Sequence, residues 1–219
     1  MKNKVLLPIV SILLGASVII SCNKDKPVTS ESTEVSTSKD GQKYAVDTVN
    51  SKVEWKGFKV FKSENTSHFG TIKLSKGEVT VHEGALESGS FTVNMNSLEN
   101  VDLKDDAEMK GKLEGHLKAA DFFDVSKFPD ASYEISKVSK AEGGDYNTVL
   151  DGNLTIKGIT KPQQLHANVS VDGDIVSIAT KPTEIKREEF GVKFQSPVEN
   201  GVIKDEIEIQ ILVKANKEK

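Results

Sequence analysis

The sequence predicts an all-β fold, an antiparallel barrel or sandwich. Apolar and polar residues alternate with a period of two through most of the chain, which is the pattern of strands with one buried and one wet face. Short clusters rich in Gly, Asp, Glu and Lys separate these stretches at hairpin-like intervals. One-sided strands joined by tight turns are typical of antiparallel sheets, so the pattern predicts an antiparallel architecture. It does not distinguish a closed barrel from a sandwich.

The first residues, 1–21, have the layout of a secretory signal peptide. Lys2 and Lys4 precede an apolar run over residues 5–20, which is too short to span a bilayer comfortably. The segment ending at Cys22 resembles a bacterial lipobox, so we expect Cys22 to become the acylated first residue of the mature chain and to anchor it in a membrane. The alternative is an uncleaved anchor helix with an incidental cysteine.

Residues 22–43 are predicted to form a flexible tether from Cys22. They contain no apolar residue larger than valine, so they cannot bury enough surface to offset the entropy of ordering. We expect this tether to lift a single domain, residues 44–219, off the bilayer. Cys22 is the only cysteine in the chain, which excludes an intramolecular disulfide and a multi-cysteine metal site.

The chain is mildly acidic. Its formal net charge is −4, and removal of Lys2 and Lys4 with the leader would make it −6. Lysines are mixed with acids, as on a solvated surface, so we expect no binding of nucleic acid. Arg187 is the only arginine. Any bidentate anion clamp would have to use it, and a structural ion pair beside a strand is the favoured interpretation.

Period-two alternation marks the strands in the first half of the domain. We expect turns at residues 76–78 (Lys-Gly-Glu) and at Glu83-Gly84. The apolar positions of the alternation are Val53, Trp55 and Gly57, then Ile72, Leu74, Val79 and Val81, then Phe91, Val93 and Met95.

Residues 103–118 break the strand pattern and predict a short helix. Acids come early and lysines late in this stretch, which suits the helix dipole. Met109, Leu113 and Leu117 recur at helical spacing. We expect the helix to pack across one end of the barrel, followed by a turn at Phe122-Phe123, where it could plug an opening or gate it.

Alternation returns in the second half, with turns expected at residues 142–145 and 172–174. Small Gly152 and Ala167 are mixed with bulky residues on the inward faces, which either leaves room for a ligand or fits a tapered, packed core. The alternating positions are Leu150, Gly152, Leu154 and Ile156, then Leu165, Ala167, Val169 and Val171, then Ile207, Ile209, Ile211 and Val213.

Three ordered segments resemble the YceI-like family. They are Gly115-His116-Leu117-Lys118-Ala119-Ala120-Asp121-Phe122-Phe123-Asp124-Val125 with Lys127-Phe128-Pro129, Gly152-Asn153-Leu154-Thr155-Ile156-Lys157-Gly158-Ile159-Thr160-Lys161-Pro162, and Ile185-Lys186-Arg187-Glu188-Glu189-Phe190-Gly191-Val192. The resemblance implies an antiparallel lipocalin-like β-barrel of about eight strands with a short helix near one end. It also implies an apolar tunnel that holds a polyisoprenoid chain, with the polar headgroup near the mouth.

Aromatic and long apolar side chains are the candidates for lining such a tunnel. For each of them the alternative is that the side chain packs in the core and contacts no ligand. His68 joins them because the resemblance implies a cavity-facing histidine near this point. The candidates are Trp55, Phe58, His68, Phe69, Phe91, Met95, Phe122, Phe123 and Tyr133.

Motifs for metal binding and catalysis do not stand out. The four histidines occur singly and without a cysteine partner, so we expect no metal site. No nucleophile elbow, phosphate loop, dinucleotide fingerprint or paired carboxylates stand out either. We therefore expect a binding protein rather than an enzyme, with no cofactor.

Two hypotheses remain for function. In the first, an acylated protein of the bacterial cell envelope, facing the periplasm or the cell surface, carries or sequesters an isoprenoid, quinone-like or other long-chain lipid in its barrel. In the second, the barrel is a filled scaffold whose outer surface binds a protein or envelope partner. Residues Trp55-Lys56-Gly57 and 68–72 depart from the commoner family pattern, so the ligand could differ. The oligomeric state, a dimer included, is left open.

Overall fold

The computed structural model describes residues 40–219. The predicted signal peptide, Cys22 and most of the predicted tether therefore lie outside the described residues. The elements are β1 (Gln42–Val46), β2 (Lys52–Phe61), β3 (Glu64–His82), β4 (Ala85–Asn94), η1 (Met95–Ser97), β5 (Glu99–Asn100), α1 (Ala107–Lys118), β6 (Asp130–Lys140), β7 (Thr148–Ile156), β8 (Ile159–Asp172), β9 (Ile175–Thr180), β10 (Thr183–Lys186), η2 (Arg187–Phe190) and β11 (Gly201–Lys217). Gln42 and Lys43, expected at the end of the tether, already belong to β1.

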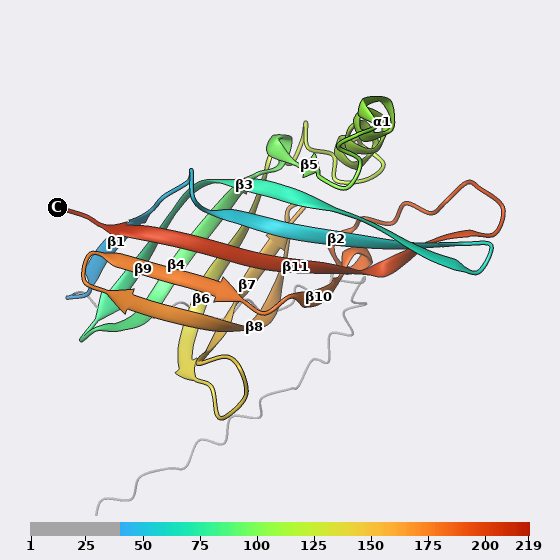
Figure 1. The fold of residues 1–219 in the computed structure, drawn as a ribbon. Helices are drawn as coiled ribbons and strands as arrows, with labels where there is room; N and C mark the ends of the chain where they lie inside the picture. Colours follow the sequence, from blue (N-terminus) through green and yellow to red (C-terminus); the bar gives the residue numbers. More distant parts are fainter. Residues whose placement is uncertain (1–39) are drawn as a thin grey trace, which may run out of the picture.

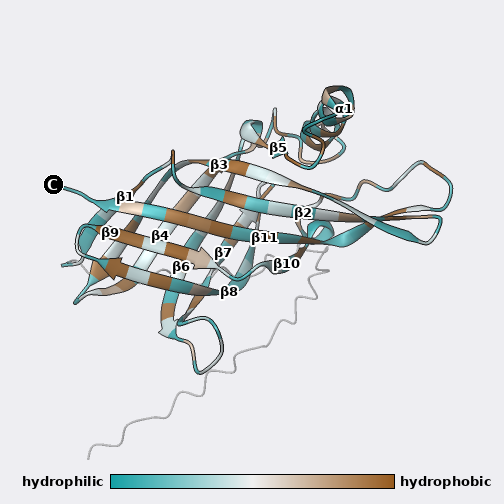
Figure 2. Cartoon of the chain, viewed as in Figure 1, coloured by the Kyte–Doolittle hydropathy of each residue, from teal (hydrophilic) through white to brown (hydrophobic). Residues whose placement is uncertain are grey.

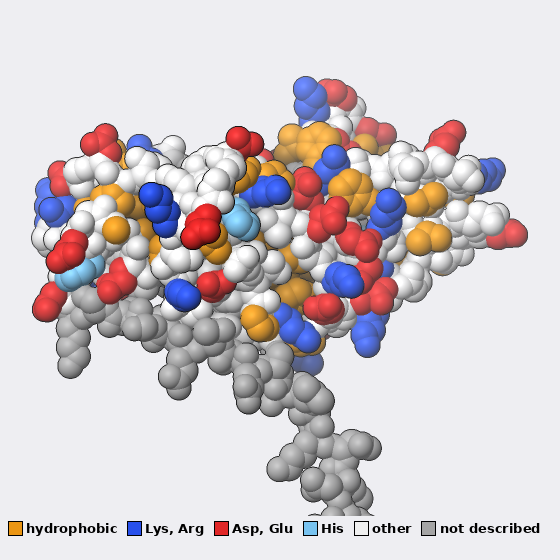
Figure 3. Space-filling view, turned by 90° about the horizontal axis from the view of Figure 1, so that it is seen from below, with side chains coloured by type: hydrophobic (Ala, Val, Ile, Leu, Met, Phe, Trp, Pro, Cys, Tyr) orange, Lys and Arg blue, Asp and Glu red, His pale blue; other side chains and the backbone are white. Residues whose placement is uncertain are grey.

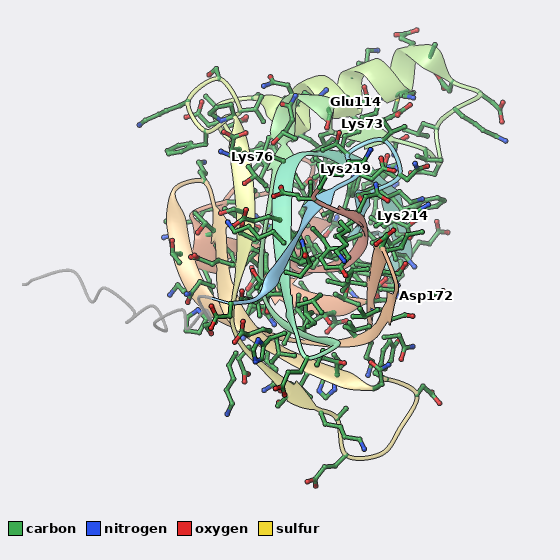
Figure 4. The ribbon with its side chains drawn as sticks, turned by 90° about the vertical axis from the view of Figure 1, so that its left-hand side faces the viewer. Lys73, Lys76, Glu114, Asp172, Lys214 and Lys219 are labelled. Carbon is green, nitrogen blue, oxygen red and sulfur yellow. The ribbon has the colours of Figure 1, made fainter. Side chains whose placement is uncertain are left out.

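The strands close into an antiparallel barrel (Figure 1). The ring runs through β11, β2, β3, β4, β6, β7, β8 and β9, and the pairing of β9 with β11 closes it. Seen from the end opposite the helix, the sheet curls around one interior, with α1 beside it (Figure 4). The predicted all-β barrel of about eight strands is thus confirmed. The strands and core of the described part come from residues 42–217, so this part forms a closed unit by itself.

Most predicted turns join neighbouring strands, and one does not. Glu83 and Gly84, both at positive φ, connect β3 to β4, and residues 173–174 connect β8 to β9. The turn predicted at residues 76–78 is wrong, because this stretch lies inside β3 at a shift of its register with β4. Gly77 is needed there for close packing, since a Cβ would lie 2.7 Å from the Ser90 carbonyl oxygen.

Alternation along the strands places one face of the sheet in the interior (Figure 2). The end of the barrel that carries the turns at residues 83–84 and 173–174 is filled with side chains. Tyr44 closes this end, and its hydroxyl donates to the Gly173 carbonyl at 2.9 Å. The buried side chains of this end include Val79, Val81, Leu86, Ile135, Leu150, Leu165, Ala167, Val176, Ile178, Val213 and Ala215.

The helix α1 lies at the opposite end of the barrel. Asp106 caps it by accepting a hydrogen bond from the Met109 backbone N–H at 3.0 Å, so the helix begins later than the predicted residue 103. Leu117 is buried against the barrel, but Met109 is 50% exposed and does not form part of a buried face. No helix within residues 40–219 is both long enough and apolar enough to cross a bilayer.

Candidate functional site

An apolar cavity occupies the half of the barrel next to α1. The enclosed space is about 120 Å³, and the whole hollow, counting the part open to solvent, is about 910 Å³. Its walls are almost wholly hydrocarbon. They are formed by Val53, Trp55, Gly57, Ile72, Phe91, Val93, Met95, Leu98, Leu117, Phe122, Phe123, Ala131, Ser132, Tyr133, Leu154, Ile156, Ile207, Ile209 and Ile211.

The wall formed by β2 and β11 is a ladder of directly opposed residues. Ile211 faces Val53, Ile209 faces Trp55, and Ile207 faces Gly57. Side chains opposite each other on an antiparallel pair share one face, so each pair contributes both members to the cavity. At Gly57 the wall leaves unfilled space, the open rung of this ladder, because a Cβ at this position would meet no atom within 4 Å.

Gly70 on β3 makes room for the Trp55 indole. The two residues are cross-strand partners, and a Cβ at Gly70 would lie 2.9 Å from the indole Cζ2 and 1.8 Å from the Glu99 carbonyl oxygen. The indole Nε1 is buried and has no hydrogen-bond partner among the described residues. The wall therefore contains one unsatisfied polar atom. Leaving a buried donor unpaired costs roughly 1–3 kcal/mol.

Tyr133 forms the floor between the hollow half and the filled half. Its hydroxyl lies 3.0 Å from the Leu150 carbonyl oxygen and 2.9 Å from the Gln163 carbonyl oxygen. Burial, and then the charge of Asp151, raise the pKa of the phenol, which stays protonated. A Cβ at Gly152 would lie 2.6 Å from the ring. The space that Gly152 leaves is therefore taken by Tyr133 and not by a ligand.

The loop after α1 forms the wall opposite β2 and β11. Phe122 and Phe123 pack edge to face with centroids 5.0 Å apart, and both line the cavity. The His116 ring packs edge-on against Phe122 and against Phe194, with centroids at 5.5 and 4.3 Å. Lys157 holds the loop from the β7–β8 turn, because its ammonium donates to the Phe122 carbonyl at 2.7 Å. Aromatic packing and this one charge-assisted bond thus fix the wall.

The cavity brings together six of the nine residues predicted to line it. These are Trp55, Phe91, Met95, Phe122, Phe123 and Tyr133. Phe58 and Phe69 point to the outer surface, because each lies one residue out of step with the inward positions of its strand. Phe58 contacts the ammonium groups of Lys56 and Lys204, and Phe69 is 46% exposed. The prediction that Phe58 and Phe69 line the cavity is therefore wrong.

His68 does not line the cavity, but it stands at its rim. It faces Gly57 across the β2–β3 pair, on the inward side of β3. Its Nδ1 lies 2.8 Å from the Asp102 carboxylate. Burial alone would raise the pKa of Asp102, but hydrogen bonds from the Phe69 N–H, His68 and Asn100 outweigh it and lower the pKa. A proton held on Nδ1 by this carboxylate leaves Nε2 as the free nitrogen of neutral His68.

The aliphatic members of the wall were not among the predicted site residues, although the alternation pattern did identify most of them. Ile207, Ile209 and Ile211 belong to one predicted strand, as Leu154 and Ile156 do to another. Leu98 and Leu117 reach the cavity from η1–β5 and α1, where no period-two signal exists. A selection made up mostly of aromatic residues therefore missed 13 of the 19 residues of the wall.

Arg187 has a structural role. Its buried guanidinium donates to three backbone carbonyls, those of Val192, Ile203 and Lys204. It also lies 3.6 Å from the Glu188 carboxylate. These bonds join η2 to the start of β11 and use three of the five guanidinium N–H donors. Because the side chain is also buried, Arg187 is a structural residue and does not present an anion clamp at the surface. Among residues 40–219, no group of three or more His, Cys, Asp or Glu is placed to hold a metal ion.

Comparison with known proteins identifies the family. Residues 44–215 match the YceI-like domain. The chain belongs to the YceI-like family. It is 35% identical over 108 residues to a UPF0312 protein of Enterobacter sp. (strain 638) and 33% identical over 108 residues to the protein YceI of Salmonella arizonae. Each match covers 48% of this chain and 50% or 51% of the relative, so the chain spans about half the length of these curated relatives.

Solved structures of similar fold support the architecture of this YceI-like chain. BcnA of Burkholderia cenocepacia is 24% identical, with a TM-score of 0.61 over 78% of this chain and 99% of that one. A polyisoprenoid binding domain from Saccharophagus degradans is 12% identical, with a TM-score of 0.51 over 80% of this chain and 98% of that one. Both likenesses concern the fold.

Proposed function

We propose that this YceI-like protein is a lipid-anchored protein of the bacterial cell envelope that carries or sequesters a long-chain apolar ligand. The ligand class is a polyisoprenoid, a quinone-like lipid or another amphiphilic lipid. The observation that carries the proposal is the hydrocarbon cavity between Tyr133 and the loop at Phe122-Phe123. A wall of this composition offers dispersion contacts and very few polar ones, which suits an alkyl or isoprenoid chain.

The size of the cavity implies that the ligand widens it. Typical small-molecule sites enclose roughly 300–1,000 Å³, whereas the enclosed space here is about 120 Å³ within a hollow of about 910 Å³. The Phe122-Phe123 loop is held by aromatic packing and by the Lys157 bond and not by strand pairing. A ligand can therefore displace it at the cost of those contacts alone, without opening the barrel. Burial of apolar area contributes about 25 cal/mol per Å², so each isoprene unit that enters adds affinity without any polar contact.

The rim at Gly57 and His68 is the proposed place for a polar headgroup. Gly57 leaves open space beside the inward face of β3, and Asp102 holds the His68 ring in one orientation. In neutral His68 the free Nε2 would accept a hydrogen bond from a ligand hydroxyl. The hydrocarbon chain would then extend from this rim towards Tyr133.

Membrane attachment is proposed to run through Cys22. The basic and apolar leader and the lipobox-like segment support an acylated cysteine, which would keep the barrel at the envelope where such ligands reside. Metabolic labelling of the full chain with a radioactive fatty acid tests this step. Label on the unaltered chain and none on Cys22→Ala supports acylation, and equal label on both contradicts it.

Native mass spectrometry tests ligand binding. Residues 40–219 would be expressed in a bacterial host and purified without detergent, and we expect a discrete added mass that disappears on organic extraction. A chain that stays bare after incubation with isoprenoids, quinones and fatty acids would refute the proposal. Such a result would favour the filled-scaffold alternative and redirect the search to a surface partner. Turnover of the lipid is not proposed, because the cavity wall contains no paired acid and base.

A further inference from the structure

The barrel carries a projecting finger at the end that holds the cavity. The finger consists of residues 58–67, which form the far end of the β2–β3 hairpin, and residues 196–203, which form the start of β11 and the segment before it. Cross-strand pairs join the two parts, with Phe61 opposite Gly201 and Val60 opposite Val202. In Figure 1 the finger extends well beyond the rest of the barrel.

The finger leaves large apolar side chains in solvent. Phe61 is 37% exposed, and Val198 and Val202 are each 55% exposed. Together with Val60 and Ile203 they border a groove of about 260 Å³. Hydrophobic side chains interspersed with charged ones are visible along this projection in Figure 3. An apolar surface of this kind that no residue of 40–219 covers is a candidate contact surface.

The finger continues the wall of the cavity. Gly57 and Ile207, which face each other in the wall, are the last lining residues of their strands before the finger. β2 then runs on to Phe61, and a shift of register between Ile203 and Ile207 in β11 separates the pairs of the finger from the pairs of the wall. A hydrocarbon chain that leaves the cavity past Gly57 therefore meets the base of the finger first.

We propose that the finger docks into the surface of a lipid bilayer and delivers the apolar ligand between that bilayer and the cavity. This inference rests on the proposed function, because a ligand that is insoluble in water must pass directly between membrane and protein. Phe61 is an apolar side chain of the kind that inserts at the boundary between headgroups and acyl chains. Lys62, whose ammonium lies 5.3 Å from the Phe61 ring centroid, and Lys59 can reach back to the headgroups along their aliphatic stems.

The charge of the finger indicates that docking is driven by apolar insertion. Lys59 and Lys62 are balanced by Glu64 and Glu199. An anionic surface would therefore add little attraction. We expect binding to neutral phosphatidylcholine vesicles, with little change on addition of phosphatidylglycerol or salt. Binding that required phosphatidylglycerol and vanished at high salt would contradict insertion of the finger.

The decisive variant is Phe61→Ser combined with Val202→Ser, in residues 40–219. Both side chains are exposed, so the core stays intact. Val49→Ser is the matched control, because Val49 is 90% exposed in the segment between β1 and β2, away from the finger. In flotation with phosphatidylcholine vesicles we expect the double variant to lose binding by a factor on the order of ten, and Val49→Ser to bind as the parent does.

The rate of ligand transfer from a membrane and the amount of ligand that the cavity holds are measured separately. Uptake of the long polyprenol solanesol from phosphatidylcholine vesicles should slow at least about tenfold in the double variant, whereas solanesol added from ethanol should fill it as fully as the parent. Equal rates in both proteins, or equal slowing by Val49→Ser, would overturn the docking surface. If the parent protein floats with the vesicles but takes up no solanesol from ethanol, the proposed ligand cavity is refuted. The contact between the finger and the membrane would not be affected by that result.

Discussion

Filling the open rung of the cavity wall should abolish ligand binding without harming the fold. Gly57→Leu places a branched side chain where a Cβ meets no atom within 4 Å, on the inward face between Ile207 and His68. Glycine inside a strand is destabilising by roughly 0.5–1 kcal/mol, so the substitution should leave the free energy of unfolding unchanged or raise it. This separates the variant from most cavity mutations, which lower stability.

The size of the binding defect follows from the apolar surface displaced. A leucine side chain takes the place of about one isoprene unit of five carbons, and each buried CH₂ contributes about 0.8 kcal/mol, which gives about 4 kcal/mol. Because each 1.4 kcal/mol is about tenfold in Kd, we expect a weakening of about three orders of magnitude. Fluorescence of Trp55, the only tryptophan, reports ligand titration, and urea unfolding reports stability.

Two glycine controls sharpen the result. Gly57→Ala should change the Kd only slightly, since one methyl group fills little of the space. Gly70→Ala should lower stability, because its Cβ would lie 1.8 Å from the Glu99 carbonyl oxygen and 2.9 Å from the Trp55 ring. If Gly57→Leu folds normally and binds ligand as tightly as the parent, then the ligand does not occupy this cavity and the reasoning fails.

Three further predictions concern Tyr133 at the floor of the cavity, Asp102 beside its rim, and the buried Arg187. Tyr133→Phe should lower the free energy of unfolding by about 1–2 kcal/mol in urea titration, because the one hydroxyl proton that the Leu150 and Gln163 carbonyl oxygens share is lost; an unchanged value would show that this hydroxyl does not stabilise the fold. The pKa of Asp102 is lowered on folding, so its contribution to stability is present above the ordinary value of about 3.9 and is lost as the pH falls through the lowered pKa. Asp102→Asn should therefore be less stable than the parent at pH 7 by an amount that shrinks towards about pH 2, and a gap that stays constant between urea titrations at these two pH values would contradict this. Arg187→Met should lower the free energy of unfolding by about 3 kcal/mol or more, because a buried guanidinium bonded to three carbonyls is lost; a thermal melt equal to that of the parent would rule out this structural role.

Local signals in the sequence determined the strands and their faces. A residue two positions from another in a strand shares its face whatever the partner strand is, so Val53, Trp55 and Gly57 were identified as one inward set before any fold was known. Turn residues with positive φ, such as Glu83-Gly84, likewise act through their own backbone. The helix predicted over residues 103–118 was found for the same reason, from its charge order and from apolar residues at helical spacing, whereas its start at the Asp106 cap was not identified.

Only the tertiary structure decided which inward residues meet empty space. The triplet Lys76-Gly77-Glu78 has the composition of a turn, but pairing on both sides with β1 and β4 holds it in a strand. Gly152 and Gly57 are both small and inward, yet Tyr133 fills the space at one and nothing fills it at the other. The physical reason is that vacancy depends on side chains from strands far apart in the sequence. Register and closure of the barrel, set by those long-range pairings, determine which of these side chains meet.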